Sequence, residues 1–234
     1  MNENFLLAST SSLYGGQYLE YLTPHLQELF SGIRTVLFIP YARPSGISHE
    51  SYTEKASAYF KILGIEVVGL HTFSNPRKAI EEAQAYFTGG GNTFLLTKML
   101  HEHSLMELLA TQVKIGKPYL GTSAGSNIGG LSIRTTNDMP IVYPPSFDAM
   151  GLIPYNLNPH YLDPDPTLKH NGETRETRIM EYLTQNHIPV LGLREGNWIR
   201  KKNQKLLIEG SCSTRIFEPG KVPYEVEAPY PLNF

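Results

Sequence analysis

The sequence predicts an α/β protein of three layers, with a mostly parallel β-sheet between two layers of helices. Short apolar runs alternate with segments of helical period, which is the pattern of parallel strands joined by crossover helices. The apolar runs are nearly continuous, as is typical of strands covered on both faces. At 234 residues the chain has the length of a single domain of this kind, and we expect one α/β domain over 1–234.

The first half of the chain alternates expected strands with expected helices. The strands expected there are residues 5–9, 35–40, 66–70, 85–88 and 118–122. The helices expected between them are residues 17–30, 49–63, 76–83, 92–100 and 105–115. Gly32, Gly64 and Gly116 each follow one of these helical stretches, as is typical of a helix end that needs a residue tolerant of positive φ.

The second half of the chain has a different composition. Residues 132–171 contain many prolines, which predicts an irregular region wrapped over the scaffold with short strands embedded in it. A helix over 174–186 and a strand over 189–193 then resume the alternation. The segment 198–217 is typical of a β-hairpin or meander, with a turn near 202–204. We see no repeat and no linker composition that would divide the chain.

The overall composition favours no nucleic-acid or membrane partner. Hydrophobic residues make up 41% of the chain and charged residues 18%, and the net charge is only −2. Cys212 is the single cysteine, so no disulfide can form within the chain. The first residues lack the basic and apolar regions of a signal peptide, and no apolar run has the length of a membrane span. We therefore expect a cytoplasmic location.

A Gly-x-Ser-x-Gly pentad lies at the end of the strand expected over 118–122, where a helix is to follow. Ser123 stands between Gly121 and Gly125 in "GTSAGSN". On a tight strand-to-helix turn a nucleophile has strained backbone geometry, and small neighbours prevent clashes with the adjoining elements. The amide of Ala124 would then face a developing oxyanion. The pentad alone fits a catalytic serine and a structural turn equally well.

A second glycine cluster, "TGGGNT", also follows an expected strand and opens a helix. It lacks the ending of a P-loop and the spacing of a dinucleotide-binding motif, so nucleotide binding is disfavoured. Successive glycines let backbone amides approach a substrate oxygen, so Gly90 and Gly91 are candidates for a further oxyanion donor. A tight turn without a ligand is the alternative.

A serine nucleophile needs a base and usually an acid that orients the base. Among the eight histidines, His160 in "LNPHY" lies in the proline-rich region that must cover the carboxyl edge of the sheet. A lone loop histidine is more often structural. Glu195, which follows the strand over 189–193, and Asp138 are the two acids that could orient it, although an Asn-Asp pair more often caps a turn. We expect no metal site and no cofactor.

Six motifs in order carry a resemblance to a known family. They are "TGGGNTF", "GTSAGSN", "IRTTNDMPIV", "FDAMGLIPYNLNPHY", "GETRETRI" and "GLREGNWI". Over about residues 5–217 the chain resembles the S51 family of serine peptidases, the peptidase E group of α-aspartyl dipeptidases. The resemblance implies a fold similar to the class I glutamine amidotransferases, which is flavodoxin-like, with serine in place of their catalytic cysteine. It implies a monomer or a homodimer.

The resemblance also implies roles for the catalytic candidates. Ser123 would be the nucleophile and His160 its general base. Asp138 and Glu195 both fall on matching motif positions, and we keep both as candidate acids. We prefer Asp138 as the functionally required acid and Glu195 as the third member of a triad. The amides of Gly91 and Ala124 would hold the oxyanion.

The implied substrates are dipeptides with an N-terminal aspartate, Asp-X. Arg175 in "GETRETR" is the candidate cation for the aspartyl carboxylate, because a guanidinium can bind a carboxylate in a two-pronged way. Its alternative is an exposed arginine at a helix start, paired with a neighbouring glutamate. Glu173 or Asp138 would meet the free amine, and Asn92 beside the glycine cluster is a further candidate for substrate binding.

The chain departs from the family pattern at two positions. Thr122 precedes the nucleophile where the resemblance leads us to expect Trp, which would change the pocket wall. Arg194 stands where we expect Pro, and it would pair with Glu195. Two other functions stay open at this point: a related hydrolase that cuts the aspartate-arginine polymer cyanophycin, and a non-catalytic sensor of acidic peptides.

Overall fold

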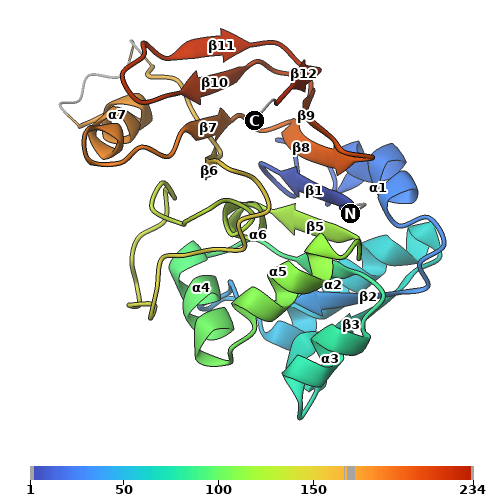
Figure 1. The fold of residues 1–234 in the computed structure, drawn as a ribbon. Helices are drawn as coiled ribbons and strands as arrows, with labels where there is room; N and C mark the ends of the chain where they lie inside the picture. The colour runs from blue at the N-terminus through green and yellow to red at the C-terminus, as the bar shows by residue number, and fades with distance from the viewer. Residues whose placement is uncertain (1–2, 166, 168–171, 233–234) are drawn as a thin grey trace.

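The computed structural model describes residues 3–165, 167 and 172–232. Within this part of the chain the strands form two sheets, one of eight strands and one of four (Figure 1). In Figure 1 the smaller sheet lies at the top and the parallel strands of the larger sheet lie below it.

The larger sheet contains all five strands expected in the first half of the chain. Its order is β12-β9-β8-β1-β5-β4-β2-β3. The strands are β1 (Phe5–Ala8), β2 (Thr35–Ile39), β3 (Glu66–Gly69), β4 (Tyr86–Thr88), β5 (Tyr119–Thr122), β8 (Asn197–Lys202), β9 (Lys205–Gly210) and β12 (Tyr230–Pro231). The first five run parallel, and the other three extend the sheet beside β1 in antiparallel order. The predicted parallel sheet is confirmed.

Helices cover both faces of the larger sheet. They are α1 (Thr23–Leu29), α2 (His49–Phe60), α3 (Pro76–Glu82), α4 (Thr93–Glu102) and α5 (Met106–Lys114). Leu6 and Ala8 of β1 pack in a core with α1 and α2, whereas Phe5 and Leu7 pack in a second core with α3, α4 and α5. Because successive side chains of a strand point to opposite faces, this division confirms the three layers.

Local sequence signals explain where most of these helices begin. The side chains of Ser48 and Asn75 each accept a hydrogen bond from a backbone amide in the first turn of α2 and α3. The helix expected over 17–30 is wrong in its first part. Leu19 has a positive φ of 58°, a 3₁₀ turn follows over Glu20–Leu22, and α1 begins at Thr23. Pro24 is suited to the first turn of a helix and not to its interior, which favours this later start.

The smaller sheet was not expected from the sequence. Its order is β11-β10-β7-β6, with strands β6 (Asn156–Pro159), β7 (Val190–Leu193), β10 (Thr214–Phe217) and β11 (Tyr224–Val226). Helix α7 (Arg175–Gln185) packs against it through Ile179 and Leu183. The strand predicted over 189–193 therefore belongs to this second sheet.

The expected hairpin of the second half is β8 and β9, joined by a turn in which Asn203 and Gln204 both have positive φ. The last part of the predicted meander, 214–217, leaves the hairpin and pairs with β7. The hairpin itself extends the larger sheet, so the C-terminal part of the chain contributes strands to both sheets.

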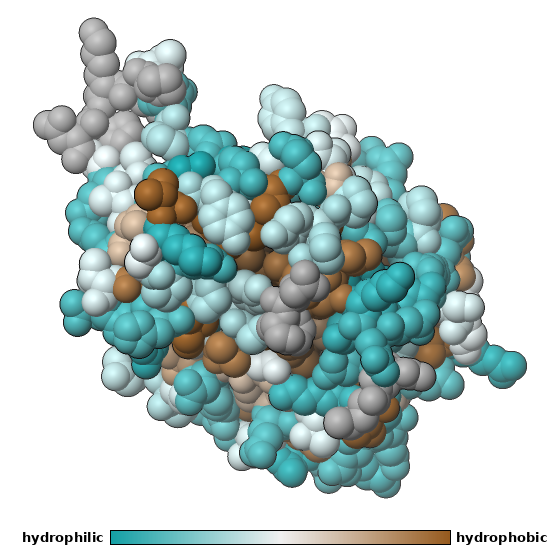
Figure 2. Space-filling model, turned by 45° about the horizontal axis from the view of Figure 1, so that its top comes forward, coloured by the Kyte–Doolittle hydropathy of each residue, from teal (hydrophilic) through white to brown (hydrophobic). Residues whose placement is uncertain are grey.

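The face shown in Figure 2 is largely hydrophilic, with separate hydrophobic patches between polar side chains. Among the described residues, no helix is long and apolar enough to cross a membrane.

Candidate active site

The candidate residues come from the carboxyl ends of strands in both sheets. Ser123 follows β5 of the larger sheet, and the glycine loop of Gly90 and Gly91 follows β4. His160 follows β6 of the smaller sheet, and Glu195 lies two residues after β7. Loops at the carboxyl ends of parallel strands are the usual place for a site in α/β proteins.

Ser123 lies on a strained turn between β5 and the short helix α6 (Ala124–Asn127). Its backbone angles are φ 53° and ψ −111°, which a residue with a side chain rarely adopts. The glycines of the pentad are needed for close packing. A Cβ at Gly125 would lie 2.1 Å from the carbonyl oxygen of Thr88, and one at Gly121 would lie 2.4 Å from that of Gly125. The turn therefore has the construction of a nucleophile elbow.

Ser123, His160 and Glu195 form a hydrogen-bonded line. The Ser123 Oγ lies 2.8 Å from His160 Nε2, and the Glu195 Oε1 lies 2.7 Å from His160 Nδ1. A proton on Nδ1 is donated to the carboxylate, so Nε2 is left free to accept the serine proton. This is the arrangement of a nucleophile, a base and an acid that orients the base.

Asp138 is not the acid beside His160. Its Oδ2 accepts a hydrogen bond from the amide of Thr93 at 2.7 Å and lies 3.2 Å from the hydroxyl of Thr136. Thr93 is the first residue of α4, and a carboxylate at a helix N-terminus is stabilised by the unpaired amides there. The spacing of residues along the chain does not determine where either carboxylate points, and the fold directs Glu195 to the imidazole.

The glycine loop lies directly beside Ser123. A Cβ at Gly90 would lie 3.0 Å from Ser123 Cβ and 3.5 Å from its Oγ. The carbonyl of Gly90 accepts a hydrogen bond from the buried Tyr52 hydroxyl at 3.1 Å, which fixes the loop. Gly91 has φ 146° and packs against the carbonyl of Ala42. The loop is close enough to Ser123 for its amides to face a substrate oxygen.

A small cavity of about 160 Å³ is lined by residues of the 134–139 loop and of α7. Arg175, the first residue of α7, and Asp138 both line it. The Nη1 of Arg175 is buried and has no hydrogen-bond partner among the described residues. Burial lowers the pKa of the Arg175 guanidinium, and the negative charge of Glu195 opposes this change. The Arg175 side chain as a whole is only partly buried, and a buried donor nitrogen without a partner is suited to a carboxylate ligand.

The other two predicted substrate-binding residues have partners within the protein. Glu173 is half exposed and lies 3.8 Å from the guanidinium of Arg178. The Asn92 side chain caps α4 by accepting from the amide of Leu95, and it donates to the carbonyl of Met139. Asn92 thus fixes the entry of α4 and the loop that carries Asp138.

A family model matches most of the chain. The model of peptidase family S51 matches residues 5–208. The chain belongs to this family. Among curated relatives, a peptidase E of Streptomyces coelicolor is 44% identical over 95% of this chain and 90% of its own. A probable alpha-aspartyl dipeptidase of Drosophila melanogaster is 44% identical over 92% of this chain and 90% of its own.

Solved structures of two further proteins share the S51 fold seen here. A putative peptidase E of Listeria monocytogenes has a TM-score of 0.67 at 21% identity and covers 91% of this chain and all of its own. A peptidase of an acI-B1 actinobacterium has a TM-score of 0.71 at 17% identity and covers all of this chain and 98% of its own. These likenesses confirm the predicted fold class.

Arg194 and Thr122, the two departures from the S51 pattern, both have well-defined surroundings. The expected pairing of Arg194 with Glu195 is wrong. Arg194 instead donates to both oxygens of Asp163 and both oxygens of Glu225, and to the carbonyl of Ser213. With these partners the side chain of Arg194 forms no ion pair with Glu195 in the described part of the chain, and Glu195 instead binds His160. Thr122 is fully buried in β5 and does not line the cavity beside Arg175.

Ser9 is a site neighbour that the sequence analysis did not single out. It follows β1 directly, and its hydroxyl contacts the backbone of His160. Its position at the end of the strand expected over 5–9 was the one available signal. Serine at such a position has no distinctive pattern, so only the fold identifies it.

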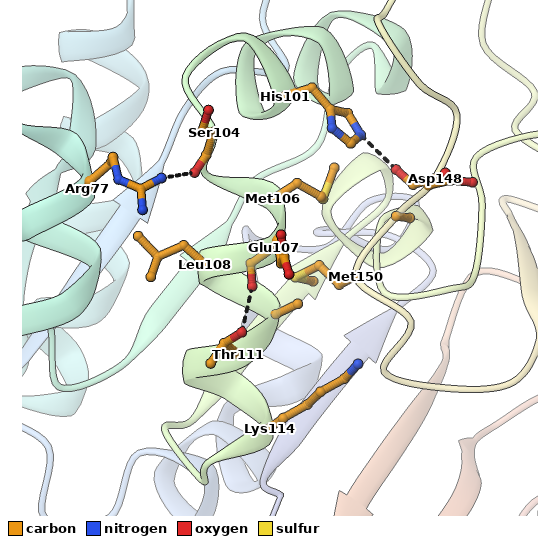
Figure 3. Close-up of a pocket in the computed structure, with 12 residues that line it drawn as sticks. Arg77, His101, Ser104, Met106, Glu107, Leu108, Thr111, Lys114, Asp148 and Met150 are labelled. Atoms are coloured by element: carbon orange, nitrogen blue, oxygen red, sulfur yellow. Dashed lines mark hydrogen bonds between the residues drawn. The ribbon is translucent and has the colours of Figure 1, made fainter.

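The S51 peptidase has a larger cavity of about 700 Å³ away from these residues (Figure 3). Glu107, Thr111 and Lys114 of α5 line it. Across from them His101 contacts the Asp148 carbonyl at 2.9 Å. None of the predicted site residues lines this cavity.

Proposed function

We propose that this S51 peptidase hydrolyses dipeptides with an N-terminal aspartate, Asp-X, through an aspartyl-enzyme intermediate. Family membership and the Drosophila relative named a probable alpha-aspartyl dipeptidase support this reaction class. The observation that carries the substrate class is the buried, unpartnered Nη1 of Arg175 in the cavity near the triad.

The proposed substrate contacts use both charges of the cavity. The aspartyl side-chain carboxylate pairs with Arg175, which has a donor to offer without breaking an existing hydrogen bond. The free ammonium group pairs with Asp138, whose Oδ1 has no hydrogen-bond partner among the described residues. Glu173 is the weaker candidate for the ammonium, because its side chain is half exposed and it does not line the cavity.

The first half of the reaction makes the acyl-enzyme. His160 Nε2 takes the proton of the Ser123 hydroxyl as Oγ forms a bond to the peptide carbonyl carbon. The carbonyl π electrons move to the oxygen, where the amides of Gly90, Gly91 and Ala124 are the candidate donors. The tetrahedral intermediate then collapses, the C–N bond breaks, and the imidazolium gives its proton to the amine of X.

The second half releases aspartate. A water molecule loses a proton to His160 as its oxygen bonds to the acyl carbon, and the returning proton reaches Ser123 Oγ as the ester bond breaks. Glu195 stabilises the imidazolium in both halves. The steps need no group beyond these side chains and water. We expect the enzyme to act on free dipeptides in the cytoplasm, as a monomer or a homodimer.

The test is hydrolysis of Asp-Leu by purified wild-type protein and by Ser123→Ala. We expect the variant to lose activity by about 10³-fold or more, because the nucleophile is removed. Leu-Leu serves as the neutral substrate, which we expect neither protein to cleave efficiently. Cleavage of Asp-Leu by Ser123→Ala at the wild-type rate would refute the proposal.

A matched pair of arginine variants tests the substrate class. In Arg175→Met we expect kcat/KM for Asp-Leu to fall by about 100-fold or more, because the carboxylate loses its partner. Arg34→Met is the control, because Arg34 is exposed, precedes β2 at the opposite end of the sheet from Ser123, and does not line this cavity. Equal effects of the two substitutions would contradict the assignment of Arg175.

A further inference from the structure

The proposed triad is divided between the two sheets. Ser123 belongs to the turn after β5 in the larger sheet, whereas His160 and Glu195 follow β6 and β7 in the smaller one. Strand pairing within either sheet therefore does not set the distance from Ser123 Oγ to His160 Nε2. Contacts across the junction of the sheets must set it.

Ser9 makes such a contact with a single hydroxyl group. It is fully buried at the carboxyl end of β1 in the larger sheet. Its Oγ accepts a hydrogen bond from the amide of His160 at 2.8 Å and donates one to the carbonyl of Leu193 at 2.8 Å. Leu193 ends β7, two residues before Glu195. One hydroxyl thus binds the chain beside the base and the chain beside the acid.

The nucleophile is tied to the same end of β1. The amide of Ser123 donates to the carbonyl of Ala8 at 3.1 Å, and the amide of Ser9 donates to the carbonyl of Asn197 at 3.0 Å. Ala8 and Ser9 are consecutive residues of one buried chain segment. All three members of the line are therefore anchored to this segment. Ser123 is held by a backbone hydrogen bond, and the chains beside His160 and Glu195 are held by the Ser9 hydroxyl.

The backbone at His160 needs such support. Its φ is 56°, a left-handed conformation that is unfavourable for a residue with a side chain. The preceding carbonyl, of Pro159, accepts a hydrogen bond from the Asn137 side chain at 2.8 Å. Ser9 holds the following amide, so the peptide group before His160 is bound at both its oxygen and its nitrogen.

We infer that Ser9 is a positioning residue that sets the imidazole of His160 against the hydroxyl of Ser123 across the junction of the two sheets. It touches no substrate, and it lines no part of the cavity beside Arg175. Loss of its hydroxyl leaves the amide of the strained His160 backbone without its partner and shifts the imidazole. A displacement of 1 Å in a catalytic group can lower a rate by about 100-fold.

The test compares Ser9→Ala with Ser132→Ala, and its substrate assay rests on the proposed function. Ser132 is the matched control, because it is also buried and its hydroxyl binds β6 at the opposite end, through the Asn156 side chain at 2.9 Å. In Ser9→Ala we expect kcat for Asp-Leu to fall by about 10- to 100-fold with KM changed by less than about 2-fold. In Ser132→Ala we expect kcat to stay near the wild-type value.

Two outcomes would overturn the inference. One is a wild-type kcat in a folded Ser9→Ala, and the other is an equal loss of kcat in Ser132→Ala. Circular dichroism checks folding. If Ser9→Ala does not fold, Ser9→Cys carries the test, because a thiol is close in size and makes weaker hydrogen bonds. We expect its kcat to lie clearly below that of the wild type, and an unchanged kcat would refute the role.

Covalent labelling of Ser123 by a fluorophosphonate separates this inference from the proposed function. Labelling requires the nucleophile and its base but no aspartyl substrate. We expect Ser9→Ala to be labelled about 10-fold more slowly than the wild type, or slower. If the wild type is labelled but does not cleave Asp-Leu, the proposed function fails and the slower labelling still supports Ser9. Labelling of both proteins at one rate refutes the role of Ser9 whatever the substrate is.

Discussion

The two residues proposed to exchange a proton both have strained backbones. Ser123 has φ 53° and His160 has φ 56°, and neither is a glycine. Strain of this kind persists where surrounding contacts determine the conformation, and it is common at catalytic sites. Here the contacts are the close packing of Gly125 on Thr88 and the hydrogen bond from His160 to Ser9.

The two acids near the site should have separable roles. In Glu195→Gln, a neutral amide faces the imidazole and no longer stabilises its positive charge. We expect kcat for Asp-Leu and the rate of fluorophosphonate labelling at Ser123 both to fall by about 10²-fold or more. In Asp138→Asn, we expect Asp-Leu hydrolysis to fall because the substrate ammonium loses its partner, while labelling stays within about 3-fold of the wild type.

Glu195→Gln and Asp138→Asn serve as controls for each other, because only the first is expected to slow labelling. Slow labelling of Asp138→Asn, with normal labelling of Glu195→Gln, would show that Asp138 orients the base and that the geometry seen here is not the reactive one. Loss of labelling in both variants would remove the distinction between a triad acid and a substrate-binding acid.

For individual residues, the sequence identified most of the candidate site residues but not their arrangement in space. Ser123, His160 and Glu195 were predicted from motifs, and His160 lies within hydrogen-bond distance of both Ser123 and Glu195. The preference for Asp138 as the required acid could not be tested by sequence, since spacing along the chain says nothing of the direction of a carboxylate. Ser9 was not predicted, because a serine at the end of a strand has no distinctive sequence pattern.

At the scale of elements, a network of charges links β11 to the turns that carry the site. Glu225 of β11 accepts from Arg194, beside Glu195, and lies 3.2 Å from Arg215. Arg215 lies 2.8 Å from Glu176, the neighbour of Arg175 in α7. The edge strand of the smaller sheet is thus held to Arg194 and, through Arg215, to Glu176, which are the sequence neighbours of Glu195 and Arg175.

This network predicts a pH-dependent stability. Hydrogen bonds from Arg194 lower the pKa of Glu225 to about 2 from an ordinary value of 4.5. A group whose pKa is lower in the folded state stabilises it fully above the unfolded pKa, and this stabilisation is lost as the pH falls. We expect Glu225→Gln to lower the free energy of unfolding at pH 6, and the difference from wild type to shrink between about pH 4.5 and 2.

Urea unfolding of both proteins at pH 6 and pH 3 measures this difference. Glu227→Gln is the control, because Glu227 is exposed and has no ion pair among the described residues. Since Glu225 is itself partly exposed, we expect a modest effect. A difference between wild type and Glu225→Gln that is the same at both pH values would contradict the role given to the carboxylate.

The elements that the sequence predicted best are those with a strong local signal. The parallel strands are short apolar runs, and α2 to α5 have clear periodicity, with capping side chains or glycines at several ends. The smaller sheet was not predicted, because β6 lies in a proline-rich segment and its partners come from distant parts of the chain. Which sheet a strand joins depends on tertiary packing, and periodicity carries no signal for it.

At the scale of the whole molecule, the parts that form the site differ in how deeply they are buried. Strands β1 and β5 are buried along their whole length in the larger sheet. Helix α7 buries only Ile179 and Leu183, in a core of five residues. Regions with few buried apolar contacts open at a lower free energy than the core.

This difference predicts a substrate-linked change in hydrogen exchange. We expect amides of α7 to exchange faster than those of β1 and β5 in the free protein. In Ser123→Ala, which cannot turn over, saturating Asp-Leu should slow exchange in α7 by binding Arg175 at its first residue. Exchange in α1, on the other side of the larger sheet, is the internal control. An unchanged rate in α7 at saturation would contradict the contact with Arg175.

The division of the site between two sheets also governs when the serine becomes active during synthesis. A growing chain contains β1 to β5, and with them Ser123, before the ribosome has made His160 and Glu195. The base and the acid become available only with the last third of the sequence, which also supplies β8 and β9 to complete the larger sheet. We therefore expect a nascent chain to lack the base and the acid that would activate Ser123 until both His160 and Glu195 have been made.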